Sequence, residues 1–303
     1  ALHKLEYKTD NDFEKKLIIM VCEKISYYID LIGPQQRVLI AFDGVAPVAK
    51  LEQQRNRRYK TWYTKEYIKE DKNSKDIDAW DTTAITPGTK FMDDLLKGVS
   101  NYFSTNNKNK KLDIIVSGSN ESGEGEHKIY SYIRDNSQYH RDTNTIIYGL
   151  DADLIMLTLI HTKITPNLYL FRETPHFITS VDSTLIPDEH YVLDIYELGE
   201  KLNLEMSSSN NNINKDCIYD YIFLCFFLGN DFMPHFPALN IRTNGITILI
   251  ETYNSLFGKT GNVLIDTKKV HWKNLRKFVE ELAKNETTYL LEEMRSREKM
   301  GKN

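Results

Sequence analysis

Hydrophobic positions in the first part of the chain follow two spacings, one typical of helices and one typical of buried strands. The first apolar stretch covers residues 13–31. In it, Leu17, Val21 and Ile25 recur every four residues, which predicts an amphipathic helix. The next apolar run, "QRVLIAFDG", is short and ends on glycine, so it predicts a buried strand. A helix followed by a strand therefore opens the pattern.

The same alternation continues further along the chain. Apolar runs predict strands within residues 110–119, 144–153 and 167–173, and helical spacing predicts helices at 123–135 and 152–160. Alternating strands and helices are typical of a mainly parallel sheet that is covered by helices. We therefore predict an α/β core with such a sheet up to about residue 190.

After about residue 190 the pattern becomes helical, and no second sheet is predicted there. The helical segments are "LDIYELGEKLNL", "CIYDYIFLCFFLG", "GITILIETYNSL" and the charged stretch from Trp272 to about Met300. Polar runs at 104–111 and 207–215 are better interpreted as surface insertions than as domain linkers. We expect one domain over residues 1–303, with a mainly helical extension over about 191–303.

Composition narrows the class of protein. With 303 residues and 41% hydrophobic content, the chain can bury a substantial core, and its apolar runs are too short for a membrane span. The three cysteines, Cys22, Cys217 and Cys225, have no metal-ligand spacing. They predict buried free thiols, no disulfide, and a reducing intracellular compartment, cytoplasmic or nuclear.

Positive charge is concentrated in one segment of an otherwise acidic chain. The net charge of −4 argues against a general polyanion binder, but residues 50–60 are rich in Lys and Arg. On a helix, the side chains of Lys50, Gln54, Arg57 and Arg58 converge on one face. Arg forks and a Lys charge suit a terminal phosphate, whereas the alternative is a solvated basic helix face.

Acidic residues recur where a predicted strand ends or a predicted helix begins. Asp151 and Asp153 directly follow one strand, and Glu124 and Glu126 stand at the entrance of a helix. The alternative is helix capping by Asp151 and favourable charge in the first turn of each helix. Asp43 ends another strand, where the alternative is an Asp–Gly turn. Ligands bind beyond the carboxyl ends of parallel strands. We therefore predict that four of these acids lie within a few ångströms of one another: Glu124, Glu126, Asp151 and Asp153.

Asp231 follows a very apolar helix, and a buried charge there costs several kcal/mol unless a cation or hydrogen bonds compensate it. Several carboxylates at one edge suit Mg²⁺, which prefers oxygen ligands. Two such ions about 4 Å apart can hydrolyse phosphodiesters, one activating water and the other stabilising the leaving oxygen. The cysteine and histidine pattern offers no zinc alternative.

Five stretches, in this order, resemble the XRN-type 5′→3′ exoribonucleases: "FDGVAPVAKLEQQRNRRYK", "ITPGTKFM", "GEGEHKI", "YGLDADLIML" and "FLGNDFMPHFPAL". The resemblance covers about residues 37–240. It implies a PIN-like or FLAP-nuclease-like core with two Mg²⁺ ions, Mn²⁺ being an alternative, that degrades single-stranded RNA with a 5′-monophosphate to nucleoside 5′-monophosphates. It also implies catalytic metal-ligand roles for Asp43, Glu124, Glu126, Asp151, Asp153 and Asp231, and a 5′-phosphate pocket formed by Lys50, Gln54, Arg57 and Arg58.

The chain departs from the family pattern at its start. The family has a further metal-site Asp in a segment resembling Asp-x-Asn-x-x-x-His, and "ALH" is interpreted as the tail of that segment, so the extreme N-terminus is expected to be missing. His3 then matches the histidine that stacks near the first nucleotide, the alternative being a frayed terminal residue. A second region of the family, which supplies a stacking tryptophan, has no recognisable counterpart here.

Two other functions remain open at this point. One is a structure-specific 5′ or flap DNA nuclease, which shares the carboxylate layout. The other is a nuclease-derived RNA-binding module that holds 5′-monophosphate ends without cleaving. The "QQRNRR" helix favours the exoribonuclease over the DNA nuclease.

Overall fold

The computed structural model describes residues 9–72, 80–106, 112–174, 183–207, 217–230 and 233–300. Two of the predicted site residues, His3 and Asp231, lie outside these residues. The chain divides into two compact units, Ala1–Tyr132 and Ile133–Asn303. Both units contain helices and strands, so the predicted mixed α/β class is confirmed.

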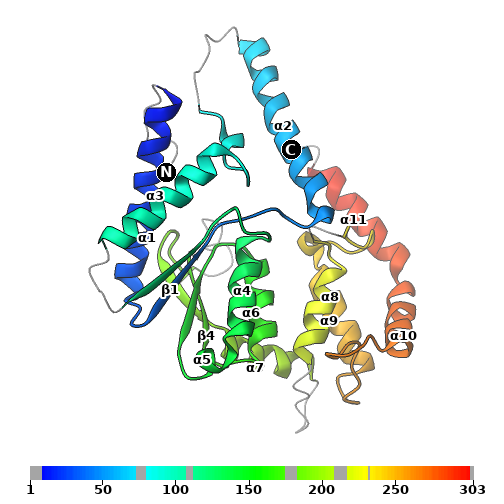
Figure 1. Cartoon of the computed structure of the whole chain (residues 1–303). Helices are drawn as coiled ribbons and strands as arrows, with labels where there is room; N and C mark the ends of the chain where they lie inside the picture. Colours follow the sequence, from blue (N-terminus) through cyan, green and yellow to red (C-terminus); the bar gives the residue numbers. More distant parts are fainter. Residues whose placement is uncertain are drawn as a thin grey trace. The chain divides into compact units, whose positions relative to one another are not determined.

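The first unit contains a parallel pair of strands. Its elements are α1 (Asp10–Ile32), β1 (Arg37–Ala41), α2 (Val48–Lys72), the short 3₁₀ helix η2 (Thr82–Ala84), α3 (Lys90–Asn106), β2 (Asp113–Ser117) and most of α4 (Gly125–Asp135), which runs into the second unit (Figure 1). Strand β1 pairs with β2 from Arg37 opposite Asp113 to Ala41 opposite Ser117. The carboxyl ends of both strands therefore lie at the same edge.

Helix α1 is defined by local signals at both ends. The side chain of Thr9 accepts a hydrogen bond from the backbone N–H of Asp12, which caps the first turn. At the other end Gly33 adopts φ 63° and donates its N–H to the carbonyl of Ile29. Glycine suits this left-handed cap because it has no Cβ to clash. The helix predicted at 13–31 is therefore confirmed, with one further turn at its start.

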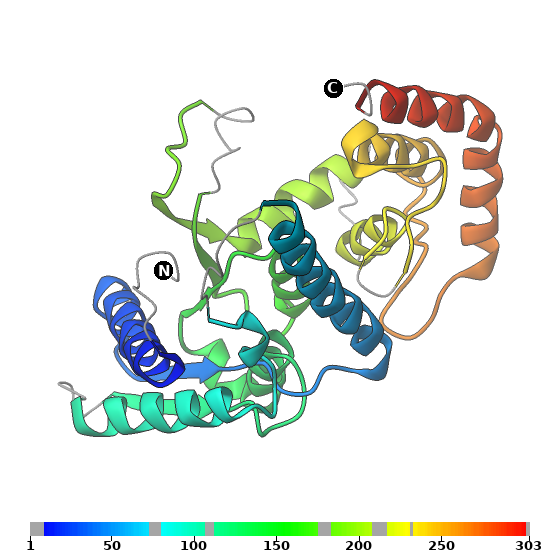
Figure 2. The same ribbon diagram turned by 90° about the horizontal axis from the view of Figure 1, so that it is seen from above.

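Helices α1 and α3 lie side by side next to the β1–β2 pair (Figures 1 and 2). Trp80 lies between them, with its ring centroid 5.3 Å from that of Phe13 and 5.0 Å from that of Phe91. Each large side chain that is fully buried in this way contributes roughly 1.5–3 kcal/mol. The buried residues of this core are Phe13, Leu17, Cys22, Trp80, Phe91, Met92, Leu95, Val99 and Phe103.

The second unit contains a three-stranded sheet followed by helices. Its elements are α5 (Ser137–Arg141), β3 (Thr145–Tyr148), α6 (Asp153–His161), β4 (Leu168–Glu173), β5 (His190–Asp194), α7 (Ile195–Met206), α8 (Cys217–Phe226), the 3₁₀ helix η4 (Ile241–Thr243), α9 (Gly245–Leu256), α10 (Trp272–Ala283) and α11 (Glu286–Met300). Strands β3 and β4 are parallel, and β5 pairs antiparallel with β4. Over the described residues the strands thus form two hydrogen-bonded sheets, not the one predicted.

Strand β5 is not predicted from the sequence, and the reason is physical. It has only five residues and none is buried, so it carries no clear apolar run. Its pairing depends on β4, which lies about twenty residues earlier, and the strand passes straight into α7. Asp194 ends the strand and caps the helix by accepting the N–H of Glu197 at 3.0 Å. Local periodicity therefore detects the helix and not the strand.

The helices predicted after residue 190 are confirmed, and the last predicted stretch divides into two. Helix α10 ends at Ala283 and α11 begins at Glu286, with a sharp change of direction between them in Figure 2. The buried core of this region comes from α7 to α10 and their connections. It contains Met206, Cys217, Leu224, Leu239, Leu249, Tyr253, Phe257, Leu264, Phe278 and Leu282.

A fully buried carboxylate, Asp220 of α8, fastens this region together. It accepts a hydrogen bond from the Tyr253 hydroxyl of α9 at 2.5 Å. It also accepts the backbone N–H groups of Leu264, at 2.9 and 3.0 Å, and Ile265, at 2.8 Å. Burial raises the pKa of Asp220, although these hydrogen bonds oppose the rise. Three separate segments are thus joined through one side chain.

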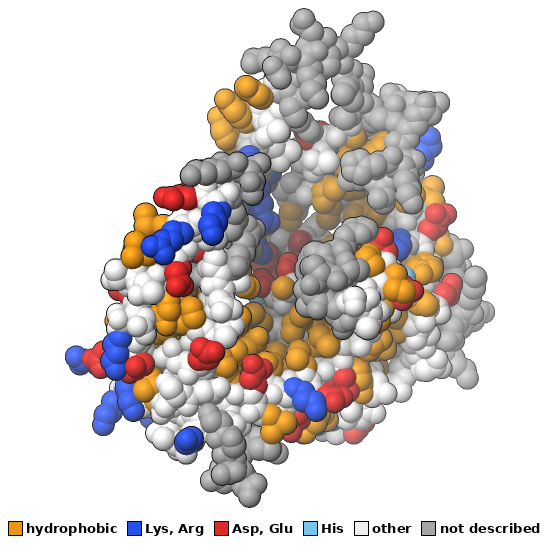
Figure 3. Space-filling model, turned by 180° about the vertical axis from the view of Figure 1, so that it is seen from behind, with side chains coloured by type: hydrophobic (Ala, Val, Ile, Leu, Met, Phe, Trp, Pro, Cys, Tyr) orange, Lys and Arg blue, Asp and Glu red, His pale blue; other side chains and the backbone are white. Residues whose placement is uncertain are grey.

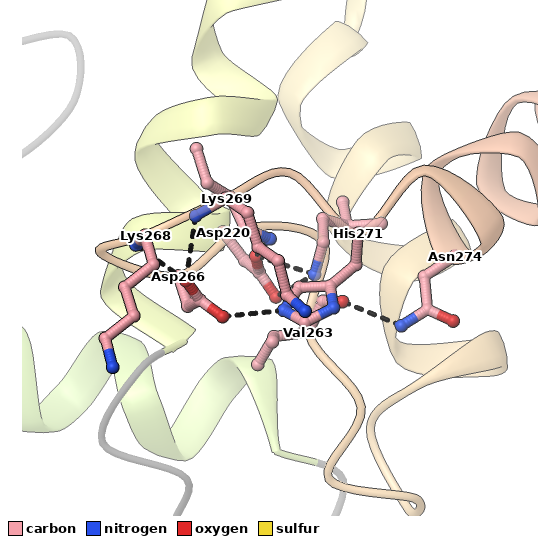
Figure 4. Close-up of polar contacts among 9 residues, drawn as sticks. Asp220, Val263, Asp266, Lys268, Lys269, His271 and Asn274 are labelled. Carbon is pink, nitrogen blue, oxygen red and sulfur yellow. Dashed lines mark hydrogen bonds and ion pairs between the residues drawn. The ribbon is translucent and has the colours of Figure 1, made fainter.

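The loop before α10 is stabilised by a second acid, Asp266, which Figure 4 shows next to Asp220. Its carboxylate accepts the backbone N–H groups of Lys268 at 2.7 Å and Lys269 at 3.0 Å, and it lies 2.8 Å from Nε2 of His271. The hydrogen bond from Lys268 is the largest of the effects that lower the pKa of Asp266. The loop therefore keeps the N–H groups of Leu264 and Ile265 in place for Asp220.

All three cysteines are free and buried. None of the helices in the described part of the chain has the length and apolar character needed to cross a membrane.

Candidate active site

Two loops that follow β1 and β2 run alongside each other. The N–H of Phe42 donates to the carbonyl of Ser117 at 2.9 Å, which extends the strand pairing. Further on, Gly44 donates to Gly123 at 2.8 Å, and Gly123 donates to Val45 at 3.0 Å. The parallel pair therefore continues as paired loops, and these loops carry Asp43 and Glu124.

Glycine is required where the loops approach most closely. A Cβ on Gly44 would lie 1.7 Å from the carbonyl oxygen of Glu121, and one on Gly125 would lie 2.8 Å from that of Ala41. The N–H of Gly125, the first residue of α4, donates to Oδ1 of Asp43 at 2.6 Å. Asp43 therefore holds the start of α4 across the sheet edge. The glycine after it serves this close packing and does not form the Asp–Gly turn considered as an alternative.

An acidic cluster surrounds this point. The ligand atoms of Glu124, Glu126 and His127 all lie within 4.8 Å of one another. Glu124 is only 5% exposed, and its Oε2 accepts no hydrogen bond from the described residues. A buried carboxylate oxygen without a partner is costly. Carboxylate oxygens are the ligands that Mg²⁺ prefers, so the residues present fit such an ion. His127 was not among the predicted ligands, although it stands in the same motif.

Lys50 contacts this cluster. Its Nζ lies 2.7 Å from Oε1 of Glu124, and the two side chains are 16% and 7% exposed. Nδ1 of His127 lies 3.6 Å from the other oxygen, Oε2. The structure thus places a predicted phosphate-binding residue against a predicted metal ligand.

The other predicted phosphate-binding residues line a cavity of about 570 Å³ in the first unit. Gln54, Arg57 and Arg58 of α2 contribute to its wall, together with Asp43. The remaining wall is formed by the segment before α3 and by apolar residues of α1 and α3. We call this space the phosphate cavity after the role predicted for Gln54, Arg57 and Arg58. It is lined by Leu17, Val21, Ala41, Phe42, Asp43, Gln54, Arg57, Arg58, Ile85, Thr86, Pro87, Phe91, Met92 and Leu95.

Three residues of the cavity wall were not assigned a role from the sequence. Ile85, Thr86 and Pro87 line the phosphate cavity, and they belong to the quoted "ITPGTKFM" stretch, which was the available signal.

Lys128, which ends the "SGEGEHK" stretch, was not assigned a role from the sequence either. Its Nζ donates to the carbonyls of Phe42 at 2.9 Å and Gly118 at 2.7 Å. Burial lowers the pKa of Lys128, although nearby acids oppose the change. Lys128 therefore bridges the two loops.

Asp151 and Asp153 belong to the second unit, at the start of α6, and both are exposed. Asp153 lies in the first turn of the helix, which agrees with the alternative of favourable acidic charge at a helix start. The N-cap, however, is Ala152, which makes no side-chain cap, so capping by Asp151 is wrong. Proximity of these acids to Glu124 and Glu126 stays a prediction, because it joins the two units. The roles of Asp231 and His3 also stay predictions.

Charge on the face in Figure 3 is mixed. Described acidic and basic side chains are interspersed there with hydrophobic ones. This agrees with the net charge of −4. Attraction of a polyanion is therefore better assigned to the local group of cations on α2 than to the overall charge of the chain.

Comparison with known proteins adds independent evidence. Residues 2–174 match the family described as "XRN 5'-3' exonuclease N-terminus", and residues 212–303 match "Xrn1 helical domain". A protein from Eremothecium gossypii named "5'-3' exoribonuclease 2" is 31% identical over 93% of this chain and 34% of its own length. The protein of that name from Arabidopsis thaliana is 32% identical over 83% of this chain and 30% of its own length.

The protein from Saccharomyces cerevisiae named "5'-3' exoribonuclease 1" is 32% identical over 90% of this chain and 19% of its own length. The chain thus spans about a third or less of the length of these curated relatives. The first family match alone covers more than half of the chain. From this match, the chain belongs to the family of XRN 5′-3′ exonucleases.

Proposed function

We propose that the protein is a Mg²⁺-dependent 5′→3′ exoribonuclease that hydrolyses RNA with a 5′-monophosphate to nucleoside 5′-monophosphates. The names of the relatives support the reaction. The observation that carries the proposal is the double position of Asp43. Its carboxylate accepts the N–H of Gly125, between the two glutamates of the acidic cluster, and it also lines the phosphate cavity. A terminal phosphate and a metal site would thus be neighbours.

Each group has a role in this proposal. Arg57 and Arg58 bind the terminal phosphate through their guanidinium forks, and Gln54 orients it with its amide. Asp43, Glu124 and Glu126 would hold Mg²⁺, and the bound ion would supply an activated water and positive charge next to the reacting phosphate. The apolar wall from α1 and α3 excludes water behind the bound end.

The finer parts of the proposal extend beyond the first unit. We include Asp151, Asp153 and Asp231 as further ligands for a second Mg²⁺, and His3 as a contact to the first nucleotide. A PIN-like core is supported by the parallel strand pairs with acids after their carboxyl ends. The buried free thiols support a reducing intracellular compartment.

The phosphate cavity predicts discrimination between RNA 5′ ends. Arg58→Ala is expected to lower kcat/KM on 5′-monophosphate RNA by about 10- to 100-fold, because a charge-assisted hydrogen bond contributes about 1.5–3 kcal/mol. Arg55→Ala is the matched control, since Arg55 is an exposed arginine of the same helix that does not line the cavity. The measurement is a decay time course at fixed salt with the full-length protein, on RNAs that differ only at the 5′ end.

The wild-type protein should degrade the monophosphate RNA fastest. It should resist 5′-hydroxyl RNA, which leaves the cations unpaired, and triphosphate or capped RNA, which overfills the cavity. Equal wild-type rates on all ends would contradict the assignment of the cavity and favour a structure-specific nuclease.

A further inference from the structure

Lys50 lies on the same face of α2 as residues that line the phosphate cavity, but Lys50 itself does not line it. It precedes Gln54 by four residues and Arg57 by seven, so the three side chains project from one side of α2. Gln54 and Arg57 line the cavity, whereas Nζ of Lys50 lies 2.7 Å from Oε1 of Glu124. One cation of the set is therefore held on the acidic cluster.

The contact has an electrostatic reason. Glu124 is almost fully buried, and its Oε2 accepts no hydrogen bond from the described residues. A carboxylate in this setting needs a positive charge, because leaving it uncompensated costs several kcal/mol. The ammonium of Lys50 supplies that charge to Oε1. It therefore takes the place of a cation at a residue whose second oxygen, Oε2, accepts no hydrogen bond from the described residues and has Nδ1 of His127 only at 3.6 Å.

We propose that Lys50 is a tethered counter-ion that competes with the divalent cation for Glu124 and joins the phosphate cavity when the cation displaces it. The inference rests on the proposed function and adds an order of events to it. Mg²⁺ binds at 2.0–2.1 Å and demands near-ideal geometry. An ammonium 2.7 Å from the same carboxylate would repel it, so one positive group must leave.

The displaced ammonium has a place to go. Gln54 lies one turn further along α2, about 6 Å along the helix axis, which is within the reach of a flexible four-carbon side chain. There Lys50 adds one positive charge to the arginines that hold the terminal phosphate. Binding of the cation and of the phosphate then favour each other, and this coupling is reciprocal.

The test measures Mg²⁺ binding by calorimetry in the absence of RNA, with the full-length protein. Lys50→Met removes the competitor and keeps the aliphatic stem, so it should raise Mg²⁺ affinity by about tenfold or more. Arg55→Met removes an exposed cation of the same helix that lines neither the cavity nor the acidic cluster, and it should change the affinity by less than about twofold. Lys50→Gln keeps a hydrogen-bond donor to Glu124 and should give an intermediate rise, which serves if the Met variant folds poorly.

A second arm uses AMP, which presents a terminal phosphate. Saturating Mg²⁺ should strengthen AMP binding to the wild-type protein, and this gain should shrink in Lys50→Met. The proposal is overturned if Lys50→Met and Arg55→Met have the same Mg²⁺ affinity, or if Lys50→Met binds Mg²⁺ more weakly than wild type. Neither readout requires turnover, so absence of RNA hydrolysis would contradict the proposed function and leave this test intact.

Discussion

Glu124→Gln is expected to lower kcat/KM for RNA hydrolysis by about 10³-fold, because metal-ion stabilisation of the transition state contributes several kcal/mol. The substitution keeps the size of the side chain and one carbonyl oxygen. It removes the negative charge that faces Lys50 and the oxygen that lacks a hydrogen-bond partner among the described residues. The measurement is steady-state kinetics on 5′-monophosphate RNA at saturating Mg²⁺, with Mg²⁺ binding followed by calorimetry.

The matched control is Glu52→Gln, an exposed acid on α2 that lies outside the acidic cluster. It should stay within about twofold of the wild-type rate, as surface substitutions do. Thermal unfolding of both variants shows whether the fold is preserved. A Glu124→Gln protein that keeps its rate, or one that loses its fold together with its rate, would contradict the metal-ligand role.

Asp220→Ala is expected to lower the free energy of unfolding by about 3–5 kcal/mol, because it removes the acceptor of two backbone N–H groups and leaves the Tyr253 hydroxyl with a long contact to the carbonyl of Asn262, at 3.4 Å. Asp220→Asn is the matched variant. Its amide oxygen can accept the N–H groups of Leu264 and Ile265, and its NH₂ can donate to the Tyr253 hydroxyl, so we expect a loss of only about 1–2 kcal/mol. Denaturant unfolding measures both. Equal losses for the two variants would show that the hydrogen bonds contribute little.

The pH dependence of stability separates charge from hydrogen bonding at the same residue. Burial raises the pKa of Asp220 in the folded protein, so the folded state binds its proton more tightly than the unfolded state. The stability that Asp220 contributes by binding this proton is fully present below the pKa of the unfolded state, about 3.9. It is lost as pH rises through the pKa of the folded state. The free energy of unfolding of wild type, relative to that of Asp220→Asn, should therefore fall as pH rises over that range. A difference that is flat with pH would contradict the raised pKa.

Much of the fold could be predicted because its signals are local. Helix α1 follows from four-residue apolar spacing, with Thr9 and Gly33 at its ends. Strands β1 and β2 follow from short apolar runs. Strand β5 could not be predicted, since its pairing depends on a distant strand and none of its residues is buried. Division of the described strands into two sheets is likewise a matter of long-range pairing.

The candidate site divides in the same way. The residue types and their places after strands indicated Asp43 and Glu124 as candidates. The contacts that these residues make join positions far apart in the sequence: Asp43 accepts the N–H of Gly125, and Lys50 contacts Glu124. No spacing rule predicts them, and none predicts that Lys128 bridges the two loops through backbone carbonyls. The motifs therefore indicated candidate residues, whereas the contacts among these residues come from the structure.

We propose that the protein removes nucleotides one at a time from a 5′-monophosphate end with the help of Mg²⁺. The most direct measurement follows two samples of one RNA, labelled at the 5′ or the 3′ end, during digestion by the full-length protein with Mg²⁺ or with a chelator. We expect the 5′ label to appear at once as a nucleoside 5′-monophosphate, the 3′ label to stay on long RNA until late, and the chelator to stop the release of both. Early release of the 3′ label, internal fragments, or digestion that continues in the chelator would contradict it.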